Sequence, residues 1–370
     1  MLEYSNDTRK IQQMLDSDRG HIILENGVYD ITRSLVIHDN TRLSLMPGAV
    51  LRLADGANTY LIVNDGYGKQ ADIGKKITKN VIIEGGTWDG NNVNQVRTSD
   101  EVRDTYHEFH DECYYGMLTR FIGMQDFTLR DVVVKNPEAY AMQISLVDRF
   151  TVEHIRFDYN LLRENMDGVH INGPARNGRI IDIKGATNDD LVALNCDDCW
   201  STMITHGAIE NILVDGLWSD NGYTAVRLLS SGDPMNNIQI RNIFGTYRYY
   251  AVSFTHHRCP PYGPVWMNNI SVDGVFASKP TDTVKNPQPI IWFAWGTHSG
   301  NVSIRNVHRD EYADTIAPTV QIDPDSTVER LVLSDMTQKF HNCEEIPMIL
   351  FNGGEVRDLH MNNVQGFENR

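Results

Sequence analysis

Three features are scarce in this 370-residue chain: cysteine, long apolar runs and blocks of positive charge. The five cysteines, an odd number spread over the whole length, do not have the pattern of a disulfide framework. No apolar run approaches the roughly 20 residues of a membrane span, and the first residues lack the basic and apolar regions of a signal peptide. These absences predict a cytoplasmic protein with no membrane partner, or a secreted one if a leader has been removed.

Negative charge exceeds positive charge. The chain has 49 acidic and 33 basic residues, a net charge of −16 at pH 7, and no Lys/Arg-rich block, so a nucleic-acid partner is not expected. Such a protein repels polyanions at long range unless a local basic cleft attracts them. The single CxxC motif, Cys196-Asp-Asp-Cys199, has no second pair, and incidental thiols on a turn explain it better than a zinc or redox site. We therefore expect no metal and no cofactor.

Helical periodicity is confined to the start of the chain. Residues 7–16 have an amphipathic pattern that Asp7 or Thr8 can cap, with three apolar residues on one face: Ile11, Met14 and Leu15. After residue 20 the pattern changes to short strands separated by Gly, Asn or Pro turns, expected at 21–24, 27–31, 34–37, 41–45 and 49–53. A helical cap over residues 1–20 would close the open end of a β-stack and hide its edges.

From residue 80 onward the sequence contains a repeat. In most copies an Asn precedes an alternating apolar stretch that ends in Asp, Asn or Gly, as at 80–85, 126–131, 149–154, 211–216, 237–242, 269–274, 301–306 and 330–335. The repeated Asn residues fit left-handed bends or stacked amide ladders. Repeats of this length, with several short strands each, favour an all-β fold, a single-stranded right-handed parallel β-helix spanning residues 1–370 as one domain, over a sandwich or a propeller.

The segment 90–116 interrupts this repeat. It is polar and rich in histidine and tyrosine. Long loops on rigid scaffolds often carry binding residues, so we predict a long loop over the cleft.

Two acidic motifs lie about one repeat apart. Asp167, in Asn165-Met-Asp167-Gly, and Asp189, in Asn188-Asp-Asp190, are separated by 22 residues. One turn of a coiled β-structure brings the chain back beside itself at roughly 4.8 Å, so three carboxylates should meet on one surface. Because like charges repel, such convergence is costly and usually has a chemical reason.

The order of four motifs resembles glycoside hydrolase family 28, the polygalacturonase-type enzymes of the pectin-lyase-like β-helix fold. The four motifs are the two acidic motifs, Thr205-His206-Gly207 and Arg227-Leu-Leu229, and the likeness covers nearly the whole chain. The resemblance implies an inverting hydrolase whose substrate partner is an oligosaccharide or polysaccharide. Carried over, Asp189 is the general acid, and Asp167 and Asp190 hold and deprotonate water. His206 then tunes the acid or contacts the sugar, and Arg227 binds substrate.

Two departures from that family bear on the substrate. The Gly-rich loop that normally follows the His-Gly pair is absent, and Leu229 stands where the family has a lysine that would hold a uronate carboxylate. Strand alternation places Leu229 on the same face as Arg227, and an apolar side chain cannot bind a carboxylate. His170 occupies an outward position near Asp167, where the family tends to have an acidic residue.

Other cleft residues have two interpretations. Three basic residues one coil beyond Arg227 either replace the missing cation or form a solvated loop: His256, His257 and Arg258. Aromatic residues further along either line the far cleft or pack in the core: Tyr249, Tyr250, Trp292, Trp295 and His298.

Three functions therefore stay open. The first is an inverting hydrolase of pectin-derived or related oligosaccharides, and the second is a β-helix glycosidase specific for a neutral glycan, with Leu229 packed against a sugar face. The third is a non-catalytic carbohydrate-binding β-helix. A lyase is weaker, because the sequence has no calcium-binding carboxylate set beside an exposed lysine. The sequence does not determine the oligomeric state.

Overall fold

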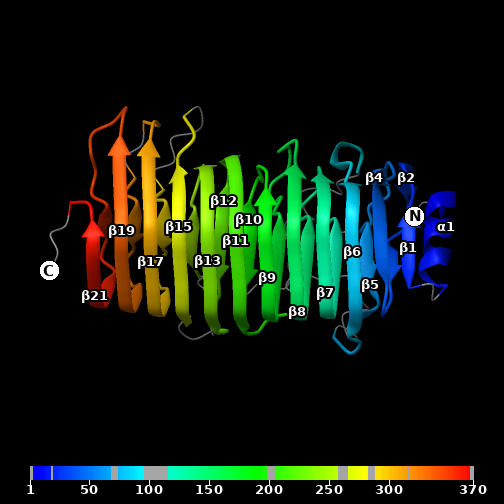
Figure 1. Cartoon of the computed structure of the whole chain (residues 1–370), viewed down its shortest axis with the longest axis horizontal. Helices are drawn as coiled ribbons and strands as arrows, with labels where there is room; N and C mark the ends of the chain where they lie inside the picture. Colours follow the sequence, from blue (N-terminus) through cyan, green and yellow to red (C-terminus); the bar gives the residue numbers. More distant parts are fainter. Residues whose placement is uncertain are drawn as a thin grey trace.

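The chain winds into one elongated stack of parallel strands, with a helix at one end and the C-terminus at the other (Figure 1). The computed structural model describes residues 3–17, 20–67, 74–95, 116–197, 205–256, 266–281, 288–314 and 317–366. Most of the predicted loop 90–116, together with His257 and Arg258, lies outside the described residues.

The N-terminal half contains α1 (Asn6–Leu15), β1 (His21–Leu24), β2 (Gly27–Ile31), β3 (Leu35–Ile37), β4 (Arg42–Leu53), β5 (Ile62–Asn64), the short 3₁₀ turn η1 (Asp65–Tyr67), β6 (Thr78–Asp89), the 3₁₀ turn η3 (Asn92–Asn94), β7 (Thr119–Lys135), β8 (Met142–Asp158) and β9 (Val169–Lys184). The C-terminal half contains β10 (Asp190–Asn195), β11 (Ile209–Gly222), β12 (Thr224–Leu229), β13 (Met235–Tyr247), β14 (Val252–Thr255), β15 (Met267–Ser278), β16 (Ile291–Phe293), β17 (His298–Glu311), β18 (Val320–Ile322), β19 (Thr327–Phe340), β20 (Ile349–Phe351) and β21 (Glu355–Val364).

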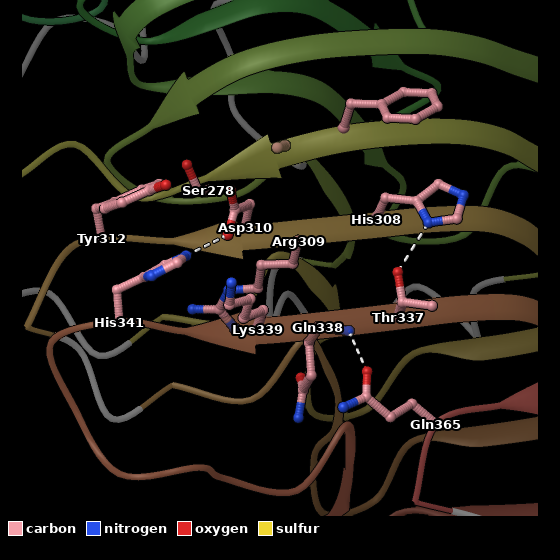
Figure 2. Close-up of a pocket in the computed structure, with 12 residues that line it drawn as sticks. Ser278, His308, Arg309, Asp310, Tyr312, Thr337, Gln338, Lys339, His341 and Gln365 are labelled. Atoms are coloured by element: carbon pink, nitrogen blue, oxygen red, sulfur yellow. Dashed lines mark hydrogen bonds and ion pairs between the residues drawn. The ribbon is translucent and has the colours of Figure 1, made fainter.

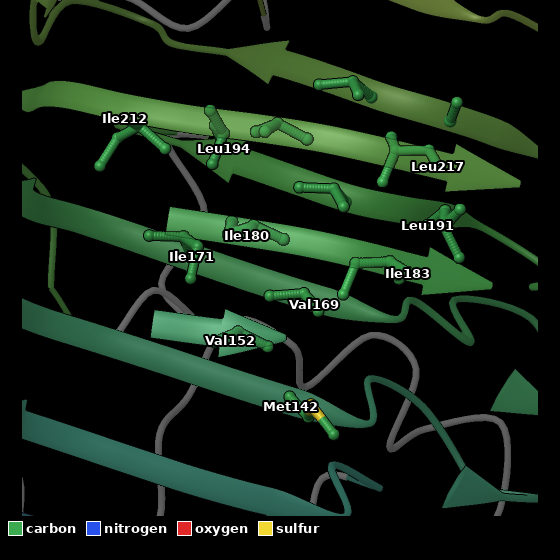
Figure 3. Packing of buried hydrophobic residues seen from close by; sticks show 14 of the residues in the cluster. Met142, Val152, Val169, Ile171, Ile180, Ile183, Leu191, Leu194, Ile212 and Leu217 are labelled. Atoms are coloured by element: carbon green, nitrogen blue, oxygen red, sulfur yellow. The ribbon is translucent and has the colours of Figure 1, made fainter. Parts of the chain in front are cut away.

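These strands confirm the predicted parallel β-helix. Every pairing between them is parallel, and each strand pairs with its counterpart in the next coil. Equivalent inward residues therefore form rows along the stack, such as Val169, Val192, Val226, Val252, Ile291, Val320 and Ile349. Figure 3 shows part of the core that such rows build, from β8 to β11: Met142, Val152, Val169, Ile171, Ile180, Ile183, Leu191, Leu194, Ile212 and Leu217. Each such side chain contributes about 1.5–3 kcal/mol through burial.

Left-handed residues bend the longer strands from one face of the helix to the next. Asn80, Asn211, Asn237 and Asn269 all have φ between 53° and 59°, which Asn tolerates better than most residues. Their side chains also form a ladder: Asn211 donates to Asn177 at 3.2 Å, Asn237 to Asn211 at 3.0 Å and Asn269 to Asn237 at 3.1 Å. Both predicted roles of the repeated Asn residues are present.

This ladder gives a stability prediction. Asn237→Ala should lower the free energy of unfolding by about 2 kcal/mol, because it forces a Cβ-bearing residue without local hydrogen bonding into the left-handed region and removes two ladder bonds. Asn237→Gly keeps the conformation available and should cost about 1 kcal/mol. Gln239→Ala, at an exposed position of the same strand, is the control. Chemical denaturation measures all three, and equal losses for Ala and Gly would show that the left-handed bend contributes nothing.

The N-terminal cap differs in detail from its prediction. Ser5, rather than Asp7 or Thr8, caps α1: its hydroxyl accepts from the Thr8 amide at 3.0 Å. The Thr8 side chain instead accepts from the Thr32 amide at 2.9 Å and ties the helix to the first coil. Thr8 thus has a tertiary partner that the local pattern could not reveal. Ile11 and Leu15 are buried against that coil, as predicted.

The strands predicted at 41–45 and 49–53 are one strand, β4. A shift in its register with β6 between Leu45 and Val50 absorbs the intervening Pro47 and Gly48.

After α1, the part of the chain that the structure describes contains no further α-helix. None of its helices is both long and apolar enough to cross a membrane.

Candidate functional site

The acidic motifs meet where neighbouring strands of one face begin. Asp190 opens β10, and Asp167 precedes β9 by two residues. The Gly168 amide donates to the Asp190 carbonyl at 2.9 Å, and the β9–β10 register makes Asp167 and Asp190 ladder neighbours. Their Cα atoms are therefore separated by the strand spacing of roughly 4.8 Å. Asp189 stands one residue before Asp190 and is only half-buried, so solvent reaches this edge of the cluster.

Asp167 is held by His170. His170 Nδ1 lies 2.6 Å from Asp167 Oδ2, and its Nε2 lies 3.4 Å from the Asn172 side-chain amide. With Nδ1 protonated, the imidazole donates to the carboxylate and accepts weakly from Asn172. The Tyr140 ring stacks on the imidazole at 4.1 Å, with 8° between the planes. These contacts fix the orientation of the buried Asp167 carboxylate.

Arg227 supplies positive charge to the cluster. Its Nη1 lies 3.6 Å from Asp190 Oδ2, and its Nε donates to Thr255 Oγ1 at 3.2 Å. Burial acts to lower the pKa of Arg227, but the charges of Asp190, Asp189 and Asp167 outweigh it and raise the pKa. Arg227 is therefore a permanent cation facing three carboxylates.

The carboxyls of the motif Asn188-Asp-Asp190 hold protons more tightly than usual. Burial raises the pKa of Asp189, although Arg227 and His170 act in the opposite direction. Burial, followed by the charge of Asp189, raises the pKa of Asp190 well above its ordinary value. Asp189, which is both half-exposed and proton-retaining, has the properties of a general acid.

The raised pKa of Asp190 predicts a pH-dependent gain of stability on Asp190→Asn. A group whose pKa is higher in the folded state stabilises the fold most at low pH and loses that contribution as pH rises from its ordinary value of 3.8. Asparagine cannot ionise, so the free energy of unfolding of the variant should exceed that of the unaltered chain at pH 7 and should be nearly the same as that of the unaltered chain at pH 4. Urea unfolding across this range measures the effect. Asp182→Asn, at a half-exposed position of β9, is the control, and a gain that is independent of pH would contradict the prediction.

Tyr223 and Arg248, which sequence reasoning missed, lie beside Asp189 and Asn188. In the β10–β12 register Thr224 is opposite Asp190, so Tyr223 is beside Asp189. Tyr223 stacks on Tyr249 at 4.0 Å, and Arg248 lies over the Tyr223 ring at 5.6 Å while its Nη2 donates to Asn188 Oδ1 at 2.9 Å. The signal available in the sequence was the position of Tyr223 directly before the apolar stretch that forms β12.

A second aromatic pair continues the face toward the C-terminal end. Tyr250 stacks on Trp292 at 4.8 Å, with 9° between the rings. Trp292 Nε1 donates to Asp323 Oδ2 at 2.7 Å, and the Tyr250 hydroxyl donates to Gln288 at 2.8 Å. Hydrogen bonds thus fix both rings in place along the row of coils that follows Asp189.

The other predicted substrate-binding residues lie further away. His206 pairs with Asp233 at 2.8 Å, next to Asp197. Asp190 opens β10, whereas Asp197 lies two residues beyond the end of that six-residue strand, which spans roughly 17 Å at the usual rise. Leu229 shares the outward face of β12 with Arg227, as predicted from alternation, but is only 3% exposed and offers little surface to a sugar. His256 lies edge-on to Trp295 at 5.3 Å.

Cys196, the described half of the CxxC motif, is buried in the core. Burial, followed by the charges of nearby carboxylates, raises the pKa of its thiol far above the ordinary value. The thiol is therefore protonated, and Cys199 lies outside the described residues.

A groove of about 590 Å³ lies on a different part of the molecule (Figure 2). Strands β15, β17 and β19 form it, and Figure 2 shows His308 on one side and Tyr312 and His341 on the other. Phe276 also lines the groove and stacks on His308 at 5.1 Å. His341 Nε2 contacts Asp310 Oδ1 at 2.6 Å, and its ring stacks on Tyr312 at 4.1 Å. The groove contains none of the predicted site residues and is separate from the acidic cluster.

Comparisons with known proteins identify the fold. No family model matches the chain. No curated protein matches it by sequence. Among solved structures, the family 28 exopolygalacturonase of Yersinia enterocolitica is 14% identical with a TM-score of 0.58, covering 95% of this chain and 75% of its own.

Two neighbours of other function are equally similar. The surface adhesin PfbA of Streptococcus pneumoniae is 12% identical with a TM-score of 0.59, and the match covers 99% of this chain and 91% of the adhesin chain. A mannuronan C-5 epimerase module of Azotobacter vinelandii is 15% identical with a TM-score of 0.57, covering 95% of this chain and 96% of the module. At these identities the likeness shows a β-helix fold shared by hydrolases, epimerases and adhesins.

Proposed function

We propose that the chain is a polygalacturonase-like glycoside hydrolase that cleaves pectin-derived or related oligosaccharides with inversion. The observation that carries this proposal is the half-buried Asp189 carboxyl, with its raised pKa, beside two further carboxylates and Arg227. Inverting hydrolysis needs one carboxylic acid to protonate the leaving oxygen and one carboxylate to activate water on the opposite side of the sugar. Both Asp189 and Asp190 have a raised pKa, and Asp189 takes the first role because it is the one of the two that is not fully buried and can therefore reach the leaving oxygen.

Asp167 and Asp190 take the second role. His170 orients Asp167 through the 2.6 Å contact, and Thr224 bonds the Asp190 side chain. A water held between these two ladder neighbours loses its proton as it attacks the anomeric carbon. Arg227 limits the charge that accumulates and binds substrate oxygen atoms.

The aromatic rows support a saccharide as the substrate. Tyr223 and Tyr249, followed by Tyr250 and Trp292, extend from Asp189 toward the C-terminal end, and aromatic rings with a hydrogen-bonded edge suit ligands that are part apolar and part polar. A saccharide substrate also agrees with the Yersinia neighbour, which is an exopolygalacturonase.

Labelled oligosaccharides test the proposal directly. Galacturonides, galactosides, rhamnosides and arabinosides are incubated with the protein, and NMR follows the anomer of the released sugar before it mutarotates. We expect one class to yield the inverted anomer. Galacturonide turnover would mean that another cation replaces the lysine, whereas neutral turnover would mean that Leu229 marks a changed specificity. A retained anomer would contradict the mechanism, and binding without any turnover would instead favour a non-catalytic carbohydrate-binding role.

One observation favours a second candidate, an epimerase or lyase acting at C5 of a uronate. The His170–Asp167 pair, stacked against Tyr140, places proton-transfer groups on the face that carries Arg227, and the Azotobacter neighbour is an epimerase. The same assay in D₂O separates the candidates. Proton abstraction exchanges C5–H for deuterium or yields an unsaturated uronate, whereas hydrolysis leaves C5–H intact.

A further inference from the structure

Three potential metal ligands meet at a turn of the β-helix away from the acidic cluster. Asp197 follows β10, His206 precedes β11 and Asp233 precedes β13. One ligand atom from each residue lies within 4.8 Å of the other two. The cluster includes His206, which the proposed hydrolysis does not use.

The separations suit one ion. His206 Nδ1 and Asp233 Oδ2 are 2.8 Å apart. Ligand atoms about 2.1 Å from a common ion lie about 3 Å apart when adjacent and about 4.2 Å apart when opposite. The His206–Asp233 pair already has the spacing of adjacent ligands. The two remaining separations are at most 4.8 Å, so a shift of up to about 1.8 Å brings either of them to the spacing of adjacent ligands.

The side chains that must move are the accessible ones. The His206 and Asp233 side chains are 62% and 28% exposed, whereas Asp197 is 1% exposed. Asp197 therefore provides a fixed oxygen, and the other two residues can adjust around it. Two carboxylates this close repel each other, and burial of one increases the cost.

We infer that Asp197, His206 and Asp233 bind one divalent transition-metal ion such as Mn²⁺ or Zn²⁺. One imidazole nitrogen and two carboxylate oxygens form a ligand set that binds these ions, whereas Ca²⁺ prefers six to eight oxygen ligands. Water completes the coordination on the exposed side. The ion cancels the repulsion between the two carboxylates.

The ion joins successive coils. Asp197 belongs to the coil of β10, and Asp233 follows β12 in the next coil. Backbone bonds already link the same segments, from the Gly207 amide to the Cys196 carbonyl at 3.0 Å and from the Ile209 amide to the Pro234 carbonyl at 3.1 Å. Binding to the folded state alone therefore stabilises the β-helix.

Titration of the chelator-treated full chain with MnCl₂ tests this site, with free Mn²⁺ followed by EPR and the unfolding midpoint followed by calorimetry. We expect one ion per chain with a micromolar Kd, and a midpoint that rises with Mn²⁺ concentration. His206→Gln and Asp233→Asn should each weaken binding by at least about 30-fold and abolish the rise.

His341→Gln is the matched control. It breaks another His–Asp contact, of 2.6 Å to Asp310 (Figure 2), which belongs to no potential metal group among the described residues. Its Mn²⁺ affinity should equal that of the unaltered chain. Absence of saturable binding, binding that His206→Gln leaves unchanged, or equal competition by Ca²⁺ would overturn the inference.

Discussion

Replacing Asp189 with asparagine is expected to lower kcat by about 10³- to 10⁴-fold, the largest catalytic effect of any single change in the acidic cluster. Asparagine has nearly the same shape but cannot donate the proton that the leaving oxygen needs. The raised pKa of Asp189 also implies that activity of the unaltered chain falls as the pH rises through that value, because the acid form is lost. The residual activity of Asp189→Asn should not show this decrease with rising pH. Steady-state kinetics across the pH range measure both effects.

Substrates with different leaving groups distinguish the role of Asp189 as the acid from the roles of the other two carboxylates. An aryl glycoside with a strongly acidic phenol needs no protonation to depart, so Asp189→Asn should hydrolyse it nearly as fast as the unaltered chain. Asp167→Asn should remain slow on the same substrate, because activation of water is still required. The Asp182→Asn variant, at a half-exposed position of β9, should match the unaltered chain on both substrates. If Asp189→Asn turned over unactivated glycosides at the normal rate, the assignment of Asp189 as the general acid would be wrong.

The second large effect is expected at a buried ion pair behind the aromatic rows. Arg309 Nη2 and Glu311 Oε2 are 2.9 Å apart, and both side chains are 0% exposed. Glu311 also accepts from the backbone amides of Ala313, at 3.0 Å, and Lys279, at 3.2 Å. The Lys279 ammonium nitrogen contacts the carbonyl of Tyr249. Burial, followed by the charge of Arg309, lowers the pKa of Lys279 well below its ordinary value.

Glu311→Gln should lower the free energy of unfolding by about 3–5 kcal/mol. The amide keeps an acceptor for the backbone but leaves the Arg309 guanidinium buried without a counter-charge. Denaturant unfolding at pH 7 measures the loss.

An exposed ion pair and a double variant control this prediction. Asp358→Asn breaks the Arg330–Asp358 pair, 3.3 Å apart with side chains 52% and 49% exposed, and should cost no more than about 1 kcal/mol. Arg309→Met combined with Glu311→Gln removes the uncompensated charge and should recover part of the loss. Equal costs at the buried and exposed pairs would show that burial of Arg309 is unimportant.

The repeat predicted the fold because its signals are local. Alternating apolar residues define the inward face of each strand, and Asn at the bends both adopts a left-handed conformation and bonds to the Asn one coil away. These two properties depend only on residue type and spacing, so they can be identified without coordinates. The register shift in β4 and the tertiary bond of the Thr8 side chain to Thr32 could not, because partners distant in sequence determine them.

Reasoning from the sequence predicted only part of the acidic cluster. The interval between Asp167 and Asp189 matched one coil, and the structure brings those residues together with Asp190, His170 and Arg227. The order of motifs also predicted that His206 belongs to the acidic cluster. His206 precedes β11, however, and the strand that pairs with β10 is β12. Tyr223 consequently stands beside Asp189, and His206 meets Asp197 and Asp233.

The sequence by itself thus determined the β-helix, its bends and the meeting of carboxylates from two adjacent coils, since each follows from strand alternation and one repeat interval. Tertiary structure alone decided the neighbours across coils of unequal length: Tyr223 at the acid, the Tyr250–Trp292 pair and the Asp197–His206–Asp233 cluster. The physical reason is that register between coils is fixed by burial of inward side chains. Insertions at the turns change the sequence distance between two residues without changing their distance in space.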